Sequence, residues 1–125
     1  MMEDDTTLAA RSFLEAWAQA FNTRDPELLV AFYAEDALLH GTSSARLYVG
    51  IEEIRTYFRG NATVRLGKQH FLPLAADAVL AVGQYVFSHE PSGQQSDTSA
   101  RFTFALRRSG DAWKILHHHS SADPT

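Results

Sequence analysis

The chain has 125 residues, with 11 Lys and Arg against 15 Asp and Glu, and it contains no cysteine. This length allows one domain with a single hydrophobic core, so folding needs neither disulfides nor a structural metal. The lack of cysteine excludes thiolate metal sites and cysteine nucleophiles. The net charge of −4 gives no reason to bind nucleic acid, and no apolar run could cross a membrane. We therefore expect a cytoplasmic protein with one domain over residues 6–121 and loose termini at 1–5 and 122–125.

Three helices are predicted in the first half of the chain. Apolar residues over 8–21 recur at the three-and-four spacing of an amphipathic helix. A second helix is predicted over 26–34, because Asp25 can cap its start and a proline suits its first turn. A third helix begins at Gly50 with an acidic first turn, and we expect Gly60–Asn61 to end it in the left-handed conformation.

After Asn61 the apolar period changes from that of a helix to the period of two that is typical of strands. Two brief extended segments are also predicted before the third helix, at 37–39 and 46–49. Four longer strands are predicted at 64–74, 79–88, 98–108 and 112–120, with turns at 77, 91–93 and 109–111. Three helices followed by an antiparallel meander define the α+β class.

The segments 79–82 and 85–87 are apolar on both faces of their strand. This is unusual in an antiparallel sheet unless both faces are covered, and three short helices cover only one face. We assign Phe102, Phe104, Leu106 and Leu116 to the second face. A face of this kind is seldom left in water, so the sequence predicts a homo-oligomer.

The last predicted strand carries three consecutive histidines at positions 117–119. Strand alternation places His117 and His119 on one face and His118 on the other. If the first two point into a cavity under the helices, they can exchange protons or bind an anion. The alternative is that they are hydrogen-bonded residues at the rim. A catalytic zinc needs a third protein ligand that no local motif supplies, so no metal is expected.

Arg101 and Thr103 share the face opposite Phe102 and Phe104, so we expect them to point towards the helices. An inward guanidinium needs a carboxylate partner, either from a ligand or from the protein. Gln84 offers an uncharged hydrogen-bonding group in the neighbouring strand. The alternative is that Arg101 lies at the surface.

Other candidates are His40, which lies where a strand opens into a loop, and the aromatic residues Trp17, Tyr33 and Tyr57. His40 is a possible proton acceptor or simply a turn residue, and the aromatic residues could line a cavity or belong to the core. The chain lacks the glycine-rich, serine-hydrolase and zinc-protease motifs, so no cofactor is expected.

Three segments together indicate a family: residues 32–37 (FYAEDA), 50–58 (GIEEIRTYF) and 110–115 (GDAWKI). With them, the chain resembles the nuclear transport factor 2-like, or SnoaL-like, superfamily. Residues 100–104 and 113–121 are most similar to bacterial relatives of the calcium/calmodulin-dependent protein kinase II association domain. The resemblance implies a cone-shaped, strongly curved antiparallel sheet of the cystatin-like kind around a long helix, a conical pocket, and dimers packed through the convex sheet face.

The sequence also departs from these relatives. Association domains of this type carry pocket arginines where this chain has Gln84 and Thr103, and Arg101 could substitute in part. Steroid isomerases of the superfamily use an aspartate base where this chain has Gly41, beside His40. No kinase domain is present. The resemblance therefore implies neither kinase activity nor the steroid isomerase mechanism.

Three functional hypotheses follow. The first is a homo-oligomer whose pocket binds a small anionic organic ligand, such as a carboxylate. The second is a lyase or isomerase in which His117 or His40 removes a proton next to a carbonyl and Arg101 stabilises the enolate. The third is an oligomerisation module with an incidental cavity. The ligand-binding residues predicted for the first hypothesis are Arg101, Gln84, Thr103, His117, His119, Tyr57, Trp17 and Tyr33.

Overall fold

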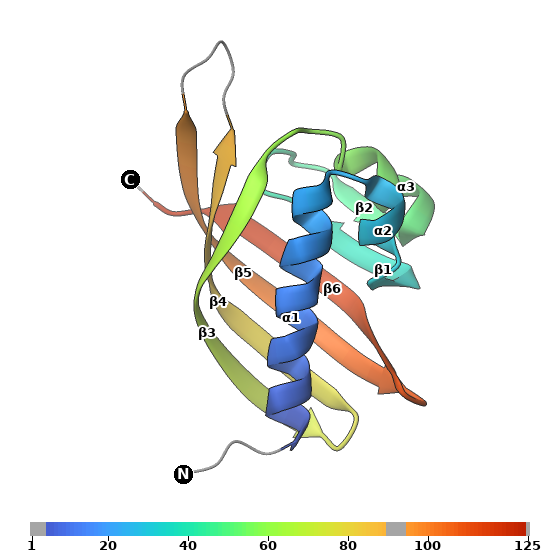
Figure 1. The fold of residues 1–125 in the computed structure, drawn as a ribbon. Helices are drawn as coiled ribbons and strands as arrows, with labels where there is room; N and C mark the ends of the chain where they lie inside the picture. The colour runs from blue at the N-terminus through green and yellow to red at the C-terminus, as the bar shows by residue number, and fades with distance from the viewer. Residues whose placement is uncertain (1–4, 90–94, 125) are drawn as a thin grey trace.

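The computed structural model describes residues 5–89 and 95–124. The predicted turn at 91–93 lies outside this part of the chain. Figure 1 shows α1 lying across one face of a curved sheet, with α2 and α3 at one end of it. In chain order the elements are α1 (Asp5–Thr23), α2 (Pro26–Val30), β1 (Tyr33–His40), β2 (Leu47–Val49), α3 (Gly50–Tyr57), β3 (Thr63–Ala75), β4 (Ala78–His89), β5 (Ser96–Ser109) and β6 (Ala112–Ala122).

The long helix α1 forms as the apolar spacing predicts. Ala10, Leu14 and Trp17 follow one another at intervals of four and three residues, and all three are fully buried against the sheet. The Trp17 ring meets the Phe104 ring of β5 edge-on at 5.2 Å. Within the described residues, no helix has the length and apolarity needed to span a membrane.

The short helix α2 starts where it was predicted, because the Asp25 carboxylate accepts a hydrogen bond of 3.0 Å from the Glu27 N–H. Its predicted extent is wrong. It ends at Val30, and the chain enters β1 at Tyr33, which pairs with Ile115 of β6. Pairing with β6 therefore places in a strand residues that the sequence pattern had assigned to the helix.

The helix α3 also ends earlier than predicted. Its last residue is Tyr57, and the following Phe58 has φ −89° and ψ 69°. Gly60 does not adopt the left-handed conformation, which among the described glycines is found at Gly50 and Gly110. The predicted stop at Gly60–Asn61 is therefore wrong.

The sheet has the strand order β2-β1-β6-β5-β4-β3. The strands β3 to β6 form the antiparallel meander that the sequence predicts. However, β1 pairs with β6 in the parallel direction, so the sheet is not antiparallel throughout. The α+β fold class, with a curved sheet around a long helix, is confirmed (Figure 1).

Irregularities in two strand pairs shape this sheet. The register between β3 and β4 shifts between Leu66 and Gln69, opposite Gly83. A Cβ atom at Gly83 would collide with the carbonyl oxygen of Lys68, so only glycine fits this close approach. A second shift falls between Ala105 and Leu106 of β5 and leaves Leu116 of β6 without a partner.

The assignment of sheet faces made from the sequence is wrong for β5. Phe102, Phe104 and Leu106 are buried beneath the helices, and Arg101 is exposed on the other face. Apolar burial decides this orientation, because the three large side chains together lose far more apolar surface to the core than Arg101 could.

The face of the sheet directed away from α1, here called the outer face, carries aliphatic side chains that no described helix covers. Leu72 is 54% exposed and Leu38 is 38% exposed. Each alternates along its strand with residues that face the core. The aliphatic residues of the outer face include Leu38, Leu72, Leu80, Val82, Val86 and Leu116.

Candidate functional site

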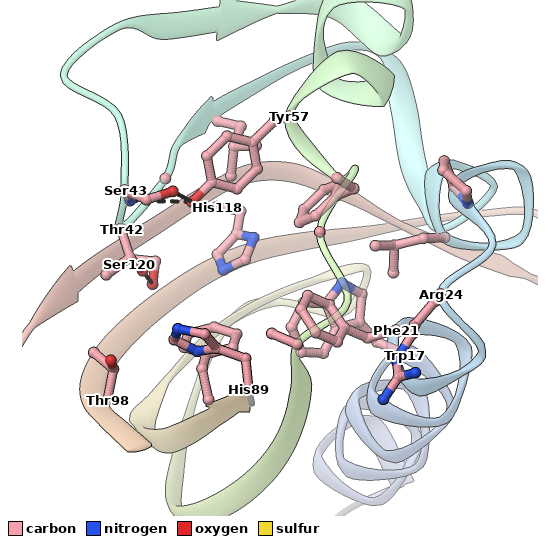
Figure 2. A pocket seen from close by; sticks show the side chains of 18 of the residues that line it. Trp17, Phe21, Arg24, Thr42, Ser43, Tyr57, His89, Thr98, His118 and Ser120 are labelled. Atoms are coloured by element: carbon pink, nitrogen blue, oxygen red, sulfur yellow. Dashed lines mark hydrogen bonds between the residues drawn. The ribbon is translucent and has the colours of Figure 1, made fainter. Parts of the chain in front are cut away.

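A cavity of about 450 Å³ lies between α1, the loop after β1 and the strands β4 to β6 (Figure 2). One wall is apolar and rich in aromatic rings. The other wall carries hydroxyl groups, two imidazoles and two charged side chains. The principal apolar side chains are Trp17, Phe21, Leu29, Leu39, Phe58 and Phe87, and the polar wall is formed by Arg24, Asp25, Thr42, Ser43, Tyr57, His89, Thr98, His118 and Ser120.

The loop after β1 brings the hydroxyl groups of the polar wall together. The Tyr57 hydroxyl accepts a hydrogen bond of 3.2 Å from the Ser43 N–H and lies 3.1 Å from Ser43 Oγ (Figure 2). The Thr42 hydroxyl is hydrogen-bonded to the Ser120 hydroxyl of β6. These contacts fix the loop to both α3 and the sheet.

Gly41 begins this loop and is buried. A Cβ atom at this position would overlap the ring of Tyr57. The aromatic ring therefore fills the space that an acidic side chain would need at position 41. This gives a physical reason why the chain carries glycine where the steroid isomerases carry their base.

His118 is 2% exposed and forms the back of the cavity. Its Nδ1 lies 2.9 Å from the Tyr33 hydroxyl, and its Nε2 lies 3.0 Å from the Tyr85 hydroxyl. The Trp17 Nε1–H donates to the Tyr33 hydroxyl at 3.2 Å. The imidazole also stacks on Phe104, with 4.0 Å between the ring centroids. Both ring nitrogens are thus satisfied inside the protein.

The cluster of His118, Tyr33 and Tyr85 is uncharged at neutral pH. Burial lowers the pKa of His118 from its ordinary value of 6.5 to about 3. Burial also raises the pKa of Tyr33 and of Tyr85. A neutral imidazole has one donor and one acceptor nitrogen, so one tyrosine donates to it and the other accepts.

The structure brings only some of the predicted site residues to the cavity. Trp17 and Tyr57 line it, as expected. Tyr33 lies behind the cavity wall and holds His118. The expectation that the remaining candidates face the cavity is wrong, because they lie on the outer face of the sheet. These are His40, Gln84, Arg101, Thr103, His117 and His119.

An extra residue in β6 explains the reversal of the histidines. Ile115 and His118 are three residues apart, yet both are buried. Leu116 is the extra residue opposite β5, so the alternation of faces changes phase there. After this bulge, His118 and Ser120 point inward while His117 and His119 point outward. The alternation assumed in the sequence prediction holds only for a regular strand.

The outward histidines gather with His40 at the C-terminal end of β1. His117 Nε2 lies 3.4 Å from His40 Nδ1, and the rings of His40 and His119 are 5.1 Å apart. Partial burial, together with His40 and His119, lowers the pKa of His117. No group of three or more possible ligands with the geometry of a metal site is found in the described part of the chain.

The site predicted from the sequence does not include His118, Ser120 or the hydroxyl-bearing loop after β1. For β5 a signal was available: alternation of large apolar residues with Arg101 and Thr103 indicates that the apolar residues face the core. The run Gly41 to Ser44 also offered hydroxyl groups at the end of a strand. No pattern in the sequence reveals the bulge at Leu116.

A SnoaL-like domain model matches residues 10–124. The chain therefore belongs to the SnoaL-like family, and the resemblance found in the sequence is confirmed. No curated protein matches the chain.

Solved structures share the whole fold. A candidate calcium/calmodulin-dependent protein kinase II association domain from Xanthomonas campestris has a TM-score of 0.88 and 28% identity, covering 98% of this chain and 90% of that chain. A nuclear transport factor 2-like protein from Pseudomonas putida has a TM-score of 0.81 and 23% identity, covering 100% and 92%. A ketosteroid isomerase-like protein from Erwinia carotovora atroseptica has a TM-score of 0.81 and 16% identity, covering 98% and 100%.

The buried His118 makes stability depend on pH. The unfolded chain, with an imidazole pKa near 6.5, binds a proton that the folded chain takes up only near pH 3. Stability is therefore lost as the pH falls below 6.5, by about 1.4 kcal/mol for each pH unit. Urea unfolding at pH 7 and pH 5 measures this loss. In His118→Gln, whose amide can still donate and accept, we expect a smaller loss between the two pH values.

His119→Gln is the matched control, because it changes an exposed histidine one residue away. It should keep the pH dependence of the wild type. Equal pH dependence in the wild type and in His118→Gln would contradict the burial of a neutral imidazole.

Proposed function

We propose that the protein binds a small, largely apolar organic molecule in the cavity beneath α1. The observation that carries this proposal is an open volume of about 450 Å³ with one aromatic wall and one polar wall that includes several hydroxyl groups. Small-molecule sites commonly have volumes of roughly 300–1,000 Å³ and combine these two kinds of lining.

The two walls define the chemistry of the ligand body. Trp17, Phe21 and Phe87 offer flat apolar surfaces suited to a ring system. Opposite them, the hydroxyls of Ser43 and Tyr57 can donate to or accept from a carbonyl or hydroxyl oxygen. Arg24 and Asp25 also line the cavity, but the neighbouring hydroxyls of Ser43 and Tyr57 are uncharged, which supports an uncharged oxygen as the group that they hold.

The evidence favours binding over proton abstraction by a histidine. His40 and His117, the predicted bases, lie on the outer face of the sheet. His118 faces the cavity, but both of its nitrogens are hydrogen-bonded to tyrosines and its pKa is lowered to about 3. A base with so low a pKa has little affinity for a proton at neutral pH.

Titration calorimetry with 1-naphthol tests the binding proposal. This neutral probe has an apolar ring system and one hydroxyl, and roughly 0.5 kcal/mol for each of its ~11 non-hydrogen atoms corresponds to a Kd of about 0.1 mM. Ala62 lines the cavity. Ala62→Trp should fill part of the space and weaken binding at least about tenfold.

The control is Ala76→Trp, which adds the same side chain in the exposed turn between β3 and β4. It should bind 1-naphthol like the wild type. Absence of saturable binding to the wild type, or equal binding by Ala62→Trp, would overturn the proposal.

We also propose that two copies of the chain associate through the outer face. The support is the uncovered aliphatic surface around Val82 and Leu116, since contiguous apolar patches of this kind often mark interfaces. The similar Xanthomonas campestris chain is named as a candidate association domain. A second copy is the simplest occupant, because a two-fold axis lets one patch cover itself.

Light scattering during size-exclusion chromatography tests the association. We expect the wild type to have twice the mass of one chain or more, and Val82→Glu to shift it to a single chain, because a carboxylate would be buried at the interface. Ala16→Glu, on the exposed side of α1, should keep the wild-type mass. A wild type that is monomeric at micromolar concentration would contradict this proposal.

A further inference from the structure

A second hollow adjoins the cavity and, unlike the cavity, has no aromatic wall of apolar side chains among its described lining residues. Its volume is about 460 Å³, and among the described residues its lining is polar. Arg24 and His89 line both hollows, so the two spaces meet at these side chains, both of which are labelled in Figure 2. The other lining residues are Asn61, Thr63, Ser88 and Gln95.

Arg24 brings a permanent positive charge to this junction. It follows α1 with a left-handed φ of 63°, and its N–H donates to the Phe21 carbonyl at 3.0 Å. Glycine or asparagine adopts this conformation at lower cost than arginine. Within the described part of the chain, the Arg24 guanidinium has no hydrogen bond or ion pair.

No described carboxylate forms an ion pair with Arg24. Asp25 borders the inner cavity, but its carboxylate caps α2 by accepting from the Glu27 N–H. Asp97 is held by the Ser88 hydroxyl at 2.8 Å and by the Gln95 amide at 3.0 Å. The described lining of the outer hollow includes no acidic side chain. An anion at the junction would therefore meet Arg24 without displacing an internal partner.

We propose that the ligand is amphipathic, with an apolar ring body in the inner cavity and a carboxylate at the junction, held by Arg24 with His89 beside it. This inference rests on the binding function proposed above. A guanidinium presents a planar pair of N–H donors that matches a carboxylate. The anion site predicted at Arg101 is thereby replaced by one at Arg24, on the cavity side of the sheet.

Two probes distinguish the contribution of the carboxylate to affinity from the contribution of the ring system. Naphthalene-1-acetate and naphthalene-1-acetamide share one skeleton and differ in charge. In the wild type we expect the acetate to bind about 10-fold more tightly by calorimetry, and added salt should reduce this preference. In Arg24→Asn, whose new residue suits the left-handed backbone, the two affinities should become equal. Arg24→Lys should keep part of the preference.

Arg101→Asn is the control, since it removes an arginine from the outer face, and it should keep the wild-type preference. Equal binding of both probes to the wild type, or an unchanged preference in Arg24→Asn, would overturn the inference and leave the cavity's binding function intact. Failure of both probes to bind would instead overturn the binding function on which the inference rests.

Discussion

The hydrogen bonds of His118 with Tyr33 and Tyr85 are the constraint on which the rest of the site depends. They join β6 to β1 and β4, and Trp17 connects the same cluster to α1. A buried imidazole is tolerated only if both nitrogens have partners and the ring stays neutral. The cluster therefore closes the back of the cavity with polar atoms that carry no charge, while the hydroxyls near the loop after β1 are hydrogen-bonded among themselves and to Ser120.

The irregular residue Leu116 determines which histidines face the cavity and which face outward. The bulge at Leu116 turns His118 towards the cavity and places His117 and His119 on the outer face. The cavity on the inner face is thus closed by a neutral imidazole, and its lining also includes Arg24 and Asp25. The outer face combines aliphatic side chains with a group of histidines.

Much of the fold was predictable from the sequence because it depends on local periodicity. The spacing of Leu14 and Trp17 predicted α1, and the change to a period of two predicted the meander. The errors arise where contacts distant in sequence decide. Tyr33 joins a strand because β6 lies beside it, and the bulge at Leu116 depends on how β6 meets β5. Trp17 and Tyr57 were predicted correctly for the cavity, whereas His118 required knowledge of that bulge.

The protonation state of His118 tests the central claim most directly. Nitrogen-15 NMR of the histidine rings, with His118 assigned by comparison with His118→Gln, reports whether each imidazole is neutral or charged at a given pH. The structure predicts that His118 remains neutral, with one protonated nitrogen, from pH 7 down to about pH 4, because burial lowers its pKa to about 3. Titration of the His118 ring near pH 6.5 would show that it faces solvent and would contradict the proposed architecture of the site.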